Sequence, residues 1–194
     1  MLFRSYFNKK SLLNRLKKIK IEYLTSIDKE TRLVIDQFNQ NDISKKSDAF
    51  FEWLKAYKWV QETPLLNFSN KNDYEFSMND NSFEIYLMKI IENKSCIGFI
   101  VLQKRNYVSK VLFTYFDNKK YSEIIANVIK LQNIIQNTRE IICYETSICN
   151  NFKKSTAFLY KTKKIKQSII SADFNVIDFS NVRMNFGDGD CCFA

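Results

Sequence analysis

Histidine is absent from this 194-residue chain, which also holds only three glycines and one proline. Without an imidazole, the chain cannot build a Ser-His-Asp triad, a Cys-His pair or the common zinc sites, and we expect no bound metal. A general base would have to be a carboxylate, or a water that a carboxylate holds. The scarcity of glycine and proline leaves the turns to asparagine and aspartate, both of which are abundant.

Long apolar runs are also missing, because no stretch of eighteen apolar residues is present to span a bilayer. The five cysteines are odd in number and no signal-peptide pattern precedes them, so we expect reduced thiols in a cytoplasmic protein. A hydrophobic content of 45% with 17 phenylalanines is enough for one core. We therefore predict a single domain at residues 19–194, without a transmembrane segment, preceded by a basic amphipathic segment or linker at residues 1–18.

Basic residues are unevenly distributed. Residues 1–20 hold seven of them and residues 151–170 hold six, with no acidic residue in either segment. In the first segment an apolar helical face lies opposite the lysines and consists of Leu12, Leu13, Leu16 and Ile19. Such a helix docks on its own domain, on a neighbouring domain, or on anionic lipid or nucleic acid. Nucleic acid is disfavoured, because the chain has no RNA-recognition, zinc-finger or clear helix-turn-helix pattern.

Apolar periodicity and turn residues predict a mixed order of strands and helices. We expect strands at 19–24, 74–78, 83–91, 96–103, 107–116, 139–146 and 173–179, and a closing segment at 183–193. We expect helices at 31–38, at 47–60, after a cap at 117–118 with apolar positions from 121 to 135, and at about 151–167. Asp117 and Asn118 offer side-chain oxygens to cap the third helix. A helix that joins neighbouring strands makes a right-handed crossover, so the strands on either side of it should pair in parallel.

This order of elements resembles the GNAT superfamily of N-acetyltransferases over roughly residues 19–194. Two segments add to the resemblance: the Trp- and Tyr-containing helix at 51–59, and the Gly-Asp-rich ending at 186–194, which is similar to the C-terminal half of two-domain bacterial members. The resemblance implies an α/β (α+β) fold with a mixed, mostly antiparallel central sheet and helices on both faces. It also implies that the first twenty residues correspond to the last strand and linker of an N-terminal half, and that the partner is another GNAT-like domain or a second copy.

The family's cofactor is acetyl-CoA, and the resemblance assigns it to the strand at 111–116 and the loop at 117–122. The implied cofactor-binding residues are Leu112, Phe113, Thr114, Asn118, Lys119, Lys120 and Asn151. Active members wrap the pyrophosphate with a glycine-containing loop at a helix N-terminus, because phosphates need close, unshielded N–H groups. Here the loop lacks both glycines and Asp117 adds a negative charge, so the acetyl-CoA loop is degenerate.

Acetyl transfer to an amine needs a base for the amine and an acid for the departing thiolate. The candidates are Glu84 and Glu145 for the base, and Tyr144 and Tyr160 for the acid. Three functions therefore stay open from the sequence: a non-catalytic GNAT-like half that binds or docks a partner, an active acetyltransferase on a small-molecule amine, and a basic protein that binds nucleic acid or an anionic membrane surface.

Overall fold

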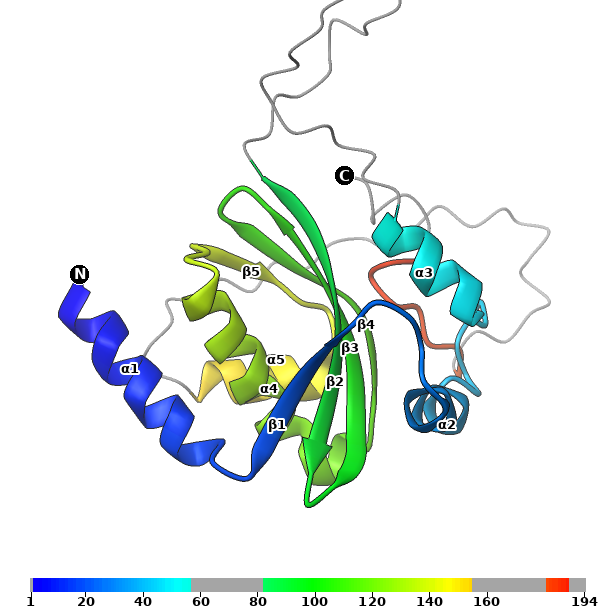
Figure 1. Ribbon diagram of the computed structural model, residues 1–194, viewed down its shortest axis with the longest axis horizontal. Helices are drawn as coiled ribbons and strands as arrows, with labels where there is room; N and C mark the ends of the chain where they lie inside the picture. The colour runs from blue at the N-terminus through cyan, green and yellow to red at the C-terminus, as the bar shows by residue number, and fades with distance from the viewer. Residues whose placement is uncertain (1, 57–81, 155–180, 189–194) are drawn as a thin grey trace, which may run out of the picture.

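The computed structural model describes residues 2–56, 82–154 and 181–188 (Figure 1). The elements in these ranges, in chain order, are α1 (Leu2–Arg15), β1 (Ile19–Leu24), α2 (Lys29–Phe38), α3 (Asp48–Ala56), β2 (Phe83–Glu92), β3 (Ser95–Arg105), β4 (Val108–Phe116), α4 (Asn118–Ile135), β5 (Glu140–Ile142) and α5 (Thr146–Lys153). The expected strand at 74–78, the helix beyond 154 and the strand at 173–179 lie outside the described residues.

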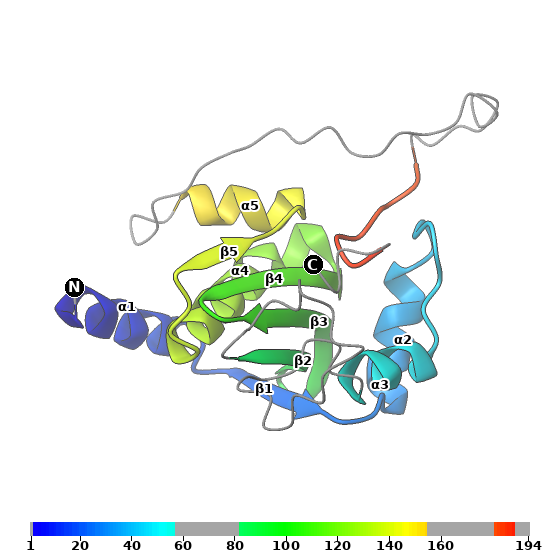
Figure 2. The ribbon, with the colours of Figure 1, turned by 90° about the horizontal axis from the view of Figure 1, so that it is seen from above.

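The five strands form one sheet in the order β1-β2-β3-β4-β5. Each pair from β1 to β4 is antiparallel, whereas β5 pairs with β4 in parallel after the crossover through α4. Helices α1, α4 and α5 lie on one side of the sheet, and α2 and α3 lie on the other (Figures 1 and 2). The expected mostly antiparallel sheet, the meander and the parallel crossover are confirmed.

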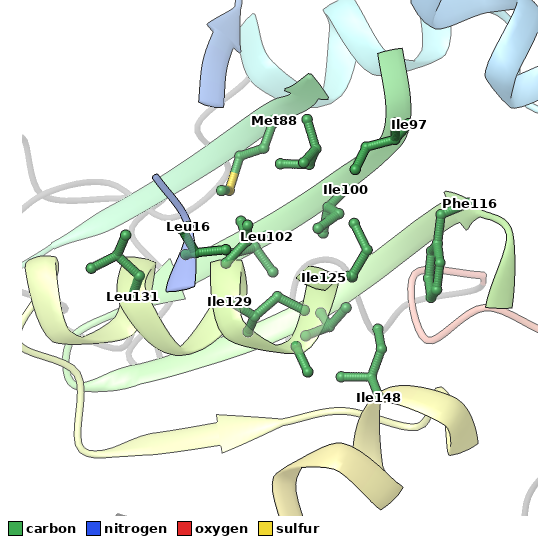
Figure 3. Close-up of a cluster of buried hydrophobic side chains, with 14 of the residues drawn as sticks. Leu16, Met88, Ile97, Ile100, Leu102, Phe116, Ile125, Ile129, Leu131 and Ile148 are labelled. Carbon is green, nitrogen blue, oxygen red and sulfur yellow. The ribbon is translucent and has the colours of Figure 1, made fainter. Parts of the chain in front are cut away.

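Helix α4 lies at the centre of the first core. Asp117 caps it, and every residue from Ile125 to Asn133 is buried. Its inner side chains Ile125 and Ile129 meet side chains of β3, and Leu16 of the α1–β1 connection joins the same cluster (Figure 3). Strand side chains alternate between the two faces of a sheet, so neighbouring residues of β3 supply both cores.

Aromatic rings fill the second core, between the sheet and α2 and α3. Phe51 of α3 is fully buried and meets Phe99, Phe113 and Tyr115 edge-on, with ring centroids 5.3, 5.9 and 6.3 Å away. Edge-to-face contacts at these distances add to the stabilisation that burial gives. The aromatic cluster of this helix is therefore core.

Asparagines occupy the tight turns that glycine would normally take. Asn93, Lys94, Asn106 and Asn137 all have positive φ angles, between 49° and 67°. Asn93 and Lys94 join β2 to β3, and Asn106 lies between β3 and β4. Asparagine tolerates this left-handed region better than most residues do, so the expected substitution of asparagine for glycine in turns is confirmed at three positions.

The N-terminal segment is a helix that packs on its own domain, and the strand that the resemblance implied for residues 1–20 is wrong over residues 2–15. Leu12 and Leu16 are buried against the first core. Leu13 is 48% exposed, so its expected place on the buried face is also wrong. Residues 12 and 16 are one turn apart on the side of α1 that packs on the first core, whereas residue 13 lies on another side of the helix.

Two boundaries near β5 differ from expectation. The strand ends at Ile142 rather than at 146, and α5 begins at Thr146 rather than near 151. Glu145 accepts a hydrogen bond from the Ser147 N–H and caps α5. Glutamate is outside the usual set of capping residues, so the sequence pattern did not indicate a helix start there. The closing segment is also not a strand over residues 183–188, where only Arg183 makes an isolated bridge, to Asp42.

Lys89 of β2 anchors the start of α2. Its ammonium lies 2.8 Å from the Asp28 carboxylate and 2.7 Å from the Glu30 carboxylate. Asp28 also caps α2 by accepting from the Thr31 N–H at 2.8 Å. Burial alone would raise the pKa of Asp28, but the hydrogen bonds from Lys89 and Thr31 outweigh it and the pKa is lowered.

We expect Phe51→Ala to lower the free energy of unfolding by about 3–5 kcal/mol, because it removes a fully buried ring and leaves a cavity. Leu33→Ala on α2 is the control, since Leu33 is 70% exposed and should change the free energy by less than about 0.5 kcal/mol. Urea denaturation measures both. Equal effects of the two substitutions would contradict the assignment of Phe51 to the core.

We expect stability to fall on acidification through the loss of the Asp28 contacts. A carboxyl group whose pKa is lower in the folded protein stabilises it above the unfolded pKa of about 3.9, and the contribution disappears as the pH falls through the folded pKa. Lys89→Met should therefore destabilise by about 1 kcal/mol at pH 7 and by less at pH 3. Lys20→Met, at an exposed lysine paired with Glu22, is the matched control. Urea denaturation between pH 3 and pH 7 measures the free energy of unfolding of each variant. If Lys89→Met does not change how this free energy depends on pH, the prediction is wrong.

Candidate functional site

A cleft of about 330 Å³ lies beside β4, where the sheet meets the start of α4 and the β5–α5 connection. It is lined by Val111, Leu112, Thr114, Asn118, Tyr144, Glu145, Thr146, Val182, Arg183, Met184, Asn185 and Phe186. Five of these residues are candidates from the sequence: Leu112, Thr114, Asn118, Tyr144 and Glu145. The structure thus brings part of the implied cofactor set together with one candidate acid and one candidate base.

The other candidates lie elsewhere. Phe113 is fully buried in the second core, and Lys119 and Lys120 are exposed on the first turn of α4. Asn151 donates to the Ser122 hydroxyl at 3.1 Å and so joins α5 to α4. Glu84 is exposed on β2, two strands from β4, where its carboxylate lies 2.5 Å from the Tyr86 hydroxyl. Tyr160 is outside the described residues.

The backbone of β4 is irregular where it borders the cleft. Val101 of β3 pairs with Phe113 and the next residue, Leu102, pairs with Val111, so Leu112 is an extra residue without a partner on β3. This is a β-bulge, which bends a strand and redirects its backbone groups. The pairing of β4 with β5 ends at Lys110 and Ile142, so the bulge lies just beyond the end of the parallel ladder.

Beyond that point, residues 183–187 donate hydrogen bonds to backbone carbonyls of β4. The Gly187 N–H donates to the Leu112 carbonyl at 2.9 Å, and the Arg183 guanidinium donates to the Thr114 carbonyl at 2.5 Å. This segment lies beside β4 in Figure 2, where it is drawn in red. No sequence signal predicts this contact, because no periodic pattern connects the segment to a strand about seventy residues earlier.

A buried polar cluster holds the segment in place. Arg183 pairs with Asp42 at 2.9 Å, and the Asn185 side chain donates to the same carboxylate at 3.0 Å. Lys46 pairs with Asp188 at 2.6 Å, and Asp188 accepts from the Asn185 N–H at 2.8 Å. Burial raises the pKa of Asp42, and the charge of Arg183 opposes that shift. Buried charges must be paired in this way, so removing any one partner would leave an uncompensated group.

The N-terminus of α4, where the resemblance places the cofactor's pyrophosphate, already binds a carboxylate. Asp117 Oδ1 accepts from the backbone N–H groups of Lys119 and Lys120 at 2.9 and 3.2 Å. The side chain of Lys120 lies over the ring of Tyr121 at 4.7 Å. A phosphate that approached these N–H groups would have to displace Asp117 and would be repelled by its charge.

Glu145 and Tyr144 both have structural contacts in the cleft wall. The Glu145 carboxylate accepts from the Ser147 N–H at 3.4 Å and from the Ser147 hydroxyl at 3.0 Å, and Asn118 donates to it at 3.5 Å. The ring of Tyr144 packs on Phe186, with 4.7 Å between centroids. One carboxylate oxygen of Glu145, Oε1, therefore accepts all of these hydrogen bonds at the start of α5.

Among the described residues, no cluster of three or more cysteine, aspartate or glutamate side chains is arranged to hold a metal ion. None of the described helices is long and apolar enough to cross a membrane. No model of a known protein family matches the chain, and no curated protein or solved structure matches it either.

We expect Gly187→Ala to detach the closing segment from β4. A Cβ atom at this position would lie 2.4 Å from two ring atoms of Phe113, which is fixed in the second core, and 3.1 Å from the Leu112 Cβ. Overpacking of this kind costs about 1–3 kcal/mol. Hydrogen exchange should therefore show lost protection of the residue 187 amide. Asn181→Ala, at an exposed residue of the same segment, is the control, and unchanged protection in Gly187→Ala would contradict the contact.

Proposed function

We propose that this chain is a GNAT-like protein with the acyl-CoA N-acyltransferase fold, acting as a non-catalytic binding or partner-docking module. Support comes from the order of elements, the antiparallel β1–β4 meander and the parallel β4–β5 pair joined by α4. The cleft beside β4 lies where the resemblance assigns the cofactor, and it contains five of the candidate residues.

The observation that carries the non-catalytic proposal is the position of Asp117. Its carboxylate already accepts from two N–H groups at the α4 N-terminus, those of Lys119 and Lys120. Backbone N–H groups without a shielding side chain are the feature that a pyrophosphate needs. A negative charge that is covalently part of the loop opposes a phosphate by both occupancy and repulsion.

The strand side of the same cleft supports the proposal independently. A pantetheine chain would be bound by backbone groups of β4, but the carbonyls of Leu112 and Thr114 already accept from Gly187 and Arg183. The candidate base Glu145 caps α5, and Glu84 lies two strands away. These contacts weigh against the alternative of an active acetyl-CoA-dependent enzyme that acts on an amine.

A partner fits best at the β1 end of the sheet. Within the described ranges no strand pairs with the outer side of β1, so its backbone groups are available to another strand. Tyr23 of this strand is 51% exposed. Another GNAT-like domain or a second copy of this chain would extend the sheet there. The basic side chains of α1 at residues 9, 10 and 15 are exposed as well. A nucleic acid or an anionic membrane surface is therefore a further candidate partner.

The proposal predicts that millimolar acetyl-CoA leaves the thermal midpoint of the purified protein unchanged, as does free CoA. A ligand that binds only the folded state must raise the midpoint, and at about one hundred times its Kd it adds about 2.7 kcal/mol to the free energy of unfolding. An active acetyltransferase measured in parallel is the positive control. A saturable rise of several degrees for this chain would overturn the proposal and favour the enzyme.

Two substitutions at residue 117 make the test specific to the α4 N-terminus. Asp117→Asn keeps a capping oxygen but removes the charge, whereas Asp117→Gly frees the N–H groups of Lys119 and Lys120. If Asp117 blocks the cofactor, a midpoint shift with acetyl-CoA should emerge first in Asp117→Gly. If neither variant responds, removal of the Asp117 carboxylate is not sufficient for acetyl-CoA binding, as expected if the hydrogen bonds of Arg183 and Gly187 to β4 also oppose it.

A further inference from the structure

Two cysteines meet at the junction of β5 and α5. Cys143 follows the last residue of β5 directly, and Cys149 lies in the first turn of α5. The Cys149 thiol donates to the Cys143 carbonyl oxygen at 3.1 Å. The Cys143 thiol lies 4.0 Å from the Glu145 carbonyl oxygen, which also accepts from the Cys149 N–H at 2.9 Å. Both residues are partly buried, and Cys143 packs against the first core.

We propose that Cys143 and Cys149 form an oxidisable dithiol site, which a hydroperoxide converts to an intramolecular disulfide between the end of β5 and the first turn of α5. The two residues already meet in the reduced protein, because the Cys149 sulfur lies against the Cys143 backbone and both residues contact the Glu145 carbonyl. A disulfide requires Cβ atoms about 3.5–4.5 Å apart, and these shared contacts hold both residues on one short turn.

The chemistry runs in two balanced steps. The Cys149 thiolate attacks one oxygen of hydrogen peroxide, an S–O bond forms as the O–O bond breaks, and the departing hydroxide takes a proton to become water. The Cys143 sulfur then attacks the sulfenic acid, the S–S bond forms, and a second water leaves with the thiol proton. The two thiols lose two electrons and two protons in total, and the peroxide is reduced to two waters.

The surroundings favour Cys149 as the first nucleophile. A hydrogen bond with the Cys143 side chain lowers the pKa of Cys149 to about 7. Burial and the charge of Glu145 oppose this shift, and the charge of Lys153 favours it. The same hydrogen bond raises the pKa of Cys143, which suits the second, resolving role. Cys96 is an internal reference, since burial raises its pKa and its thiol lies 3.7 Å from the Gly98 carbonyl.

The disulfide would enclose three residues of the cleft wall. Tyr144, Glu145 and Thr146 lie between the two cysteines and all line the cleft beside β4. Joining Cys143 to Cys149 closes this short turn covalently and fixes the start of α5 on the sheet. Oxidation would therefore reduce the conformational freedom of that wall of the cleft.

The test is limited oxidation of the folded full-length protein with hydrogen peroxide at pH 7, followed by alkylation of the remaining thiols and peptide mass mapping. We expect a peptide in which residues 143 and 149 are linked by a disulfide. It should form about tenfold faster than Cys96 is oxidised to a form that the alkylating reagent no longer modifies. Peptide mapping separates this link from any that involves Cys191 or Cys192, which lie outside the described residues. Equal oxidation of Cys96, or an unlinked pair after Cys96 has reacted, would overturn the proposal.

Variants assign the two roles. In Cys143→Ser, oxidation of Cys149 should stop at the sulfenic acid, which a cyclic 1,3-dione then traps. In Cys149→Ser, Cys143 should stay reduced and be modified by the alkylating reagent. Cys96→Ser is the matched control and should form the link at the rate of the unmodified protein. Circular dichroism checks that each variant is folded. Dione labelling of Cys143 in place of Cys149 would reverse the roles and contradict the assignment.

Discussion

The burial of α4 is the constraint on which the rest of this structure depends. The helix packs its apolar side on the sheet, but its outer side is also covered, so polar residues of its second half are buried too. Two of them have partners in neighbouring elements: Lys130 donates to the Asn151 carbonyl of α5 at 3.3 Å, and Gln132 Oε1 accepts from the Tyr23 hydroxyl of β1 at 2.5 Å. Because a buried polar group without a partner is costly, these contacts fix where α5 and β1 lie.

The position of α4 also determines the geometry of the cleft. As the crossover between β4 and β5, it fixes their parallel pairing, and that pairing ends after Lys110. Beyond this point the β4 backbone needs other hydrogen-bond partners, because buried carbonyls must be satisfied. Residues 183–187 supply them, with a charged cluster behind them that includes Asp42 and Arg183. The protein's own chain thus occupies the carbonyls of Leu112 and Thr114 at the β4 wall of the cleft.

Local signals predicted most of the elements. The strands that became β1 and β4, the β2–β3 hairpin and helices α2 and α4 lie within two residues of expectation at nearly all ends. Each has clear apolar periodicity or a standard capping residue, such as Asp28 and Asp117. The errors arose where the signal was weak. Glu145 is an unusual cap, so the end of β5 and the start of α5 were placed several residues too late.

The sequence by itself determined the alternation of strands and helices, the parallel crossover through α4, the asparagine turns and the absence of glycine from the loop at residues 117–122. These properties follow from residue types at neighbouring positions. Only the tertiary structure decided that Leu13 is exposed, that Asp117 occupies the N–H groups of α4, that residues 183–187 bind β4, and that Cys143 and Cys149 meet. Each of these depends on which groups, often distant in the sequence, come together to pair buried polar atoms or to pack. Periodicity along the chain does not indicate such contacts.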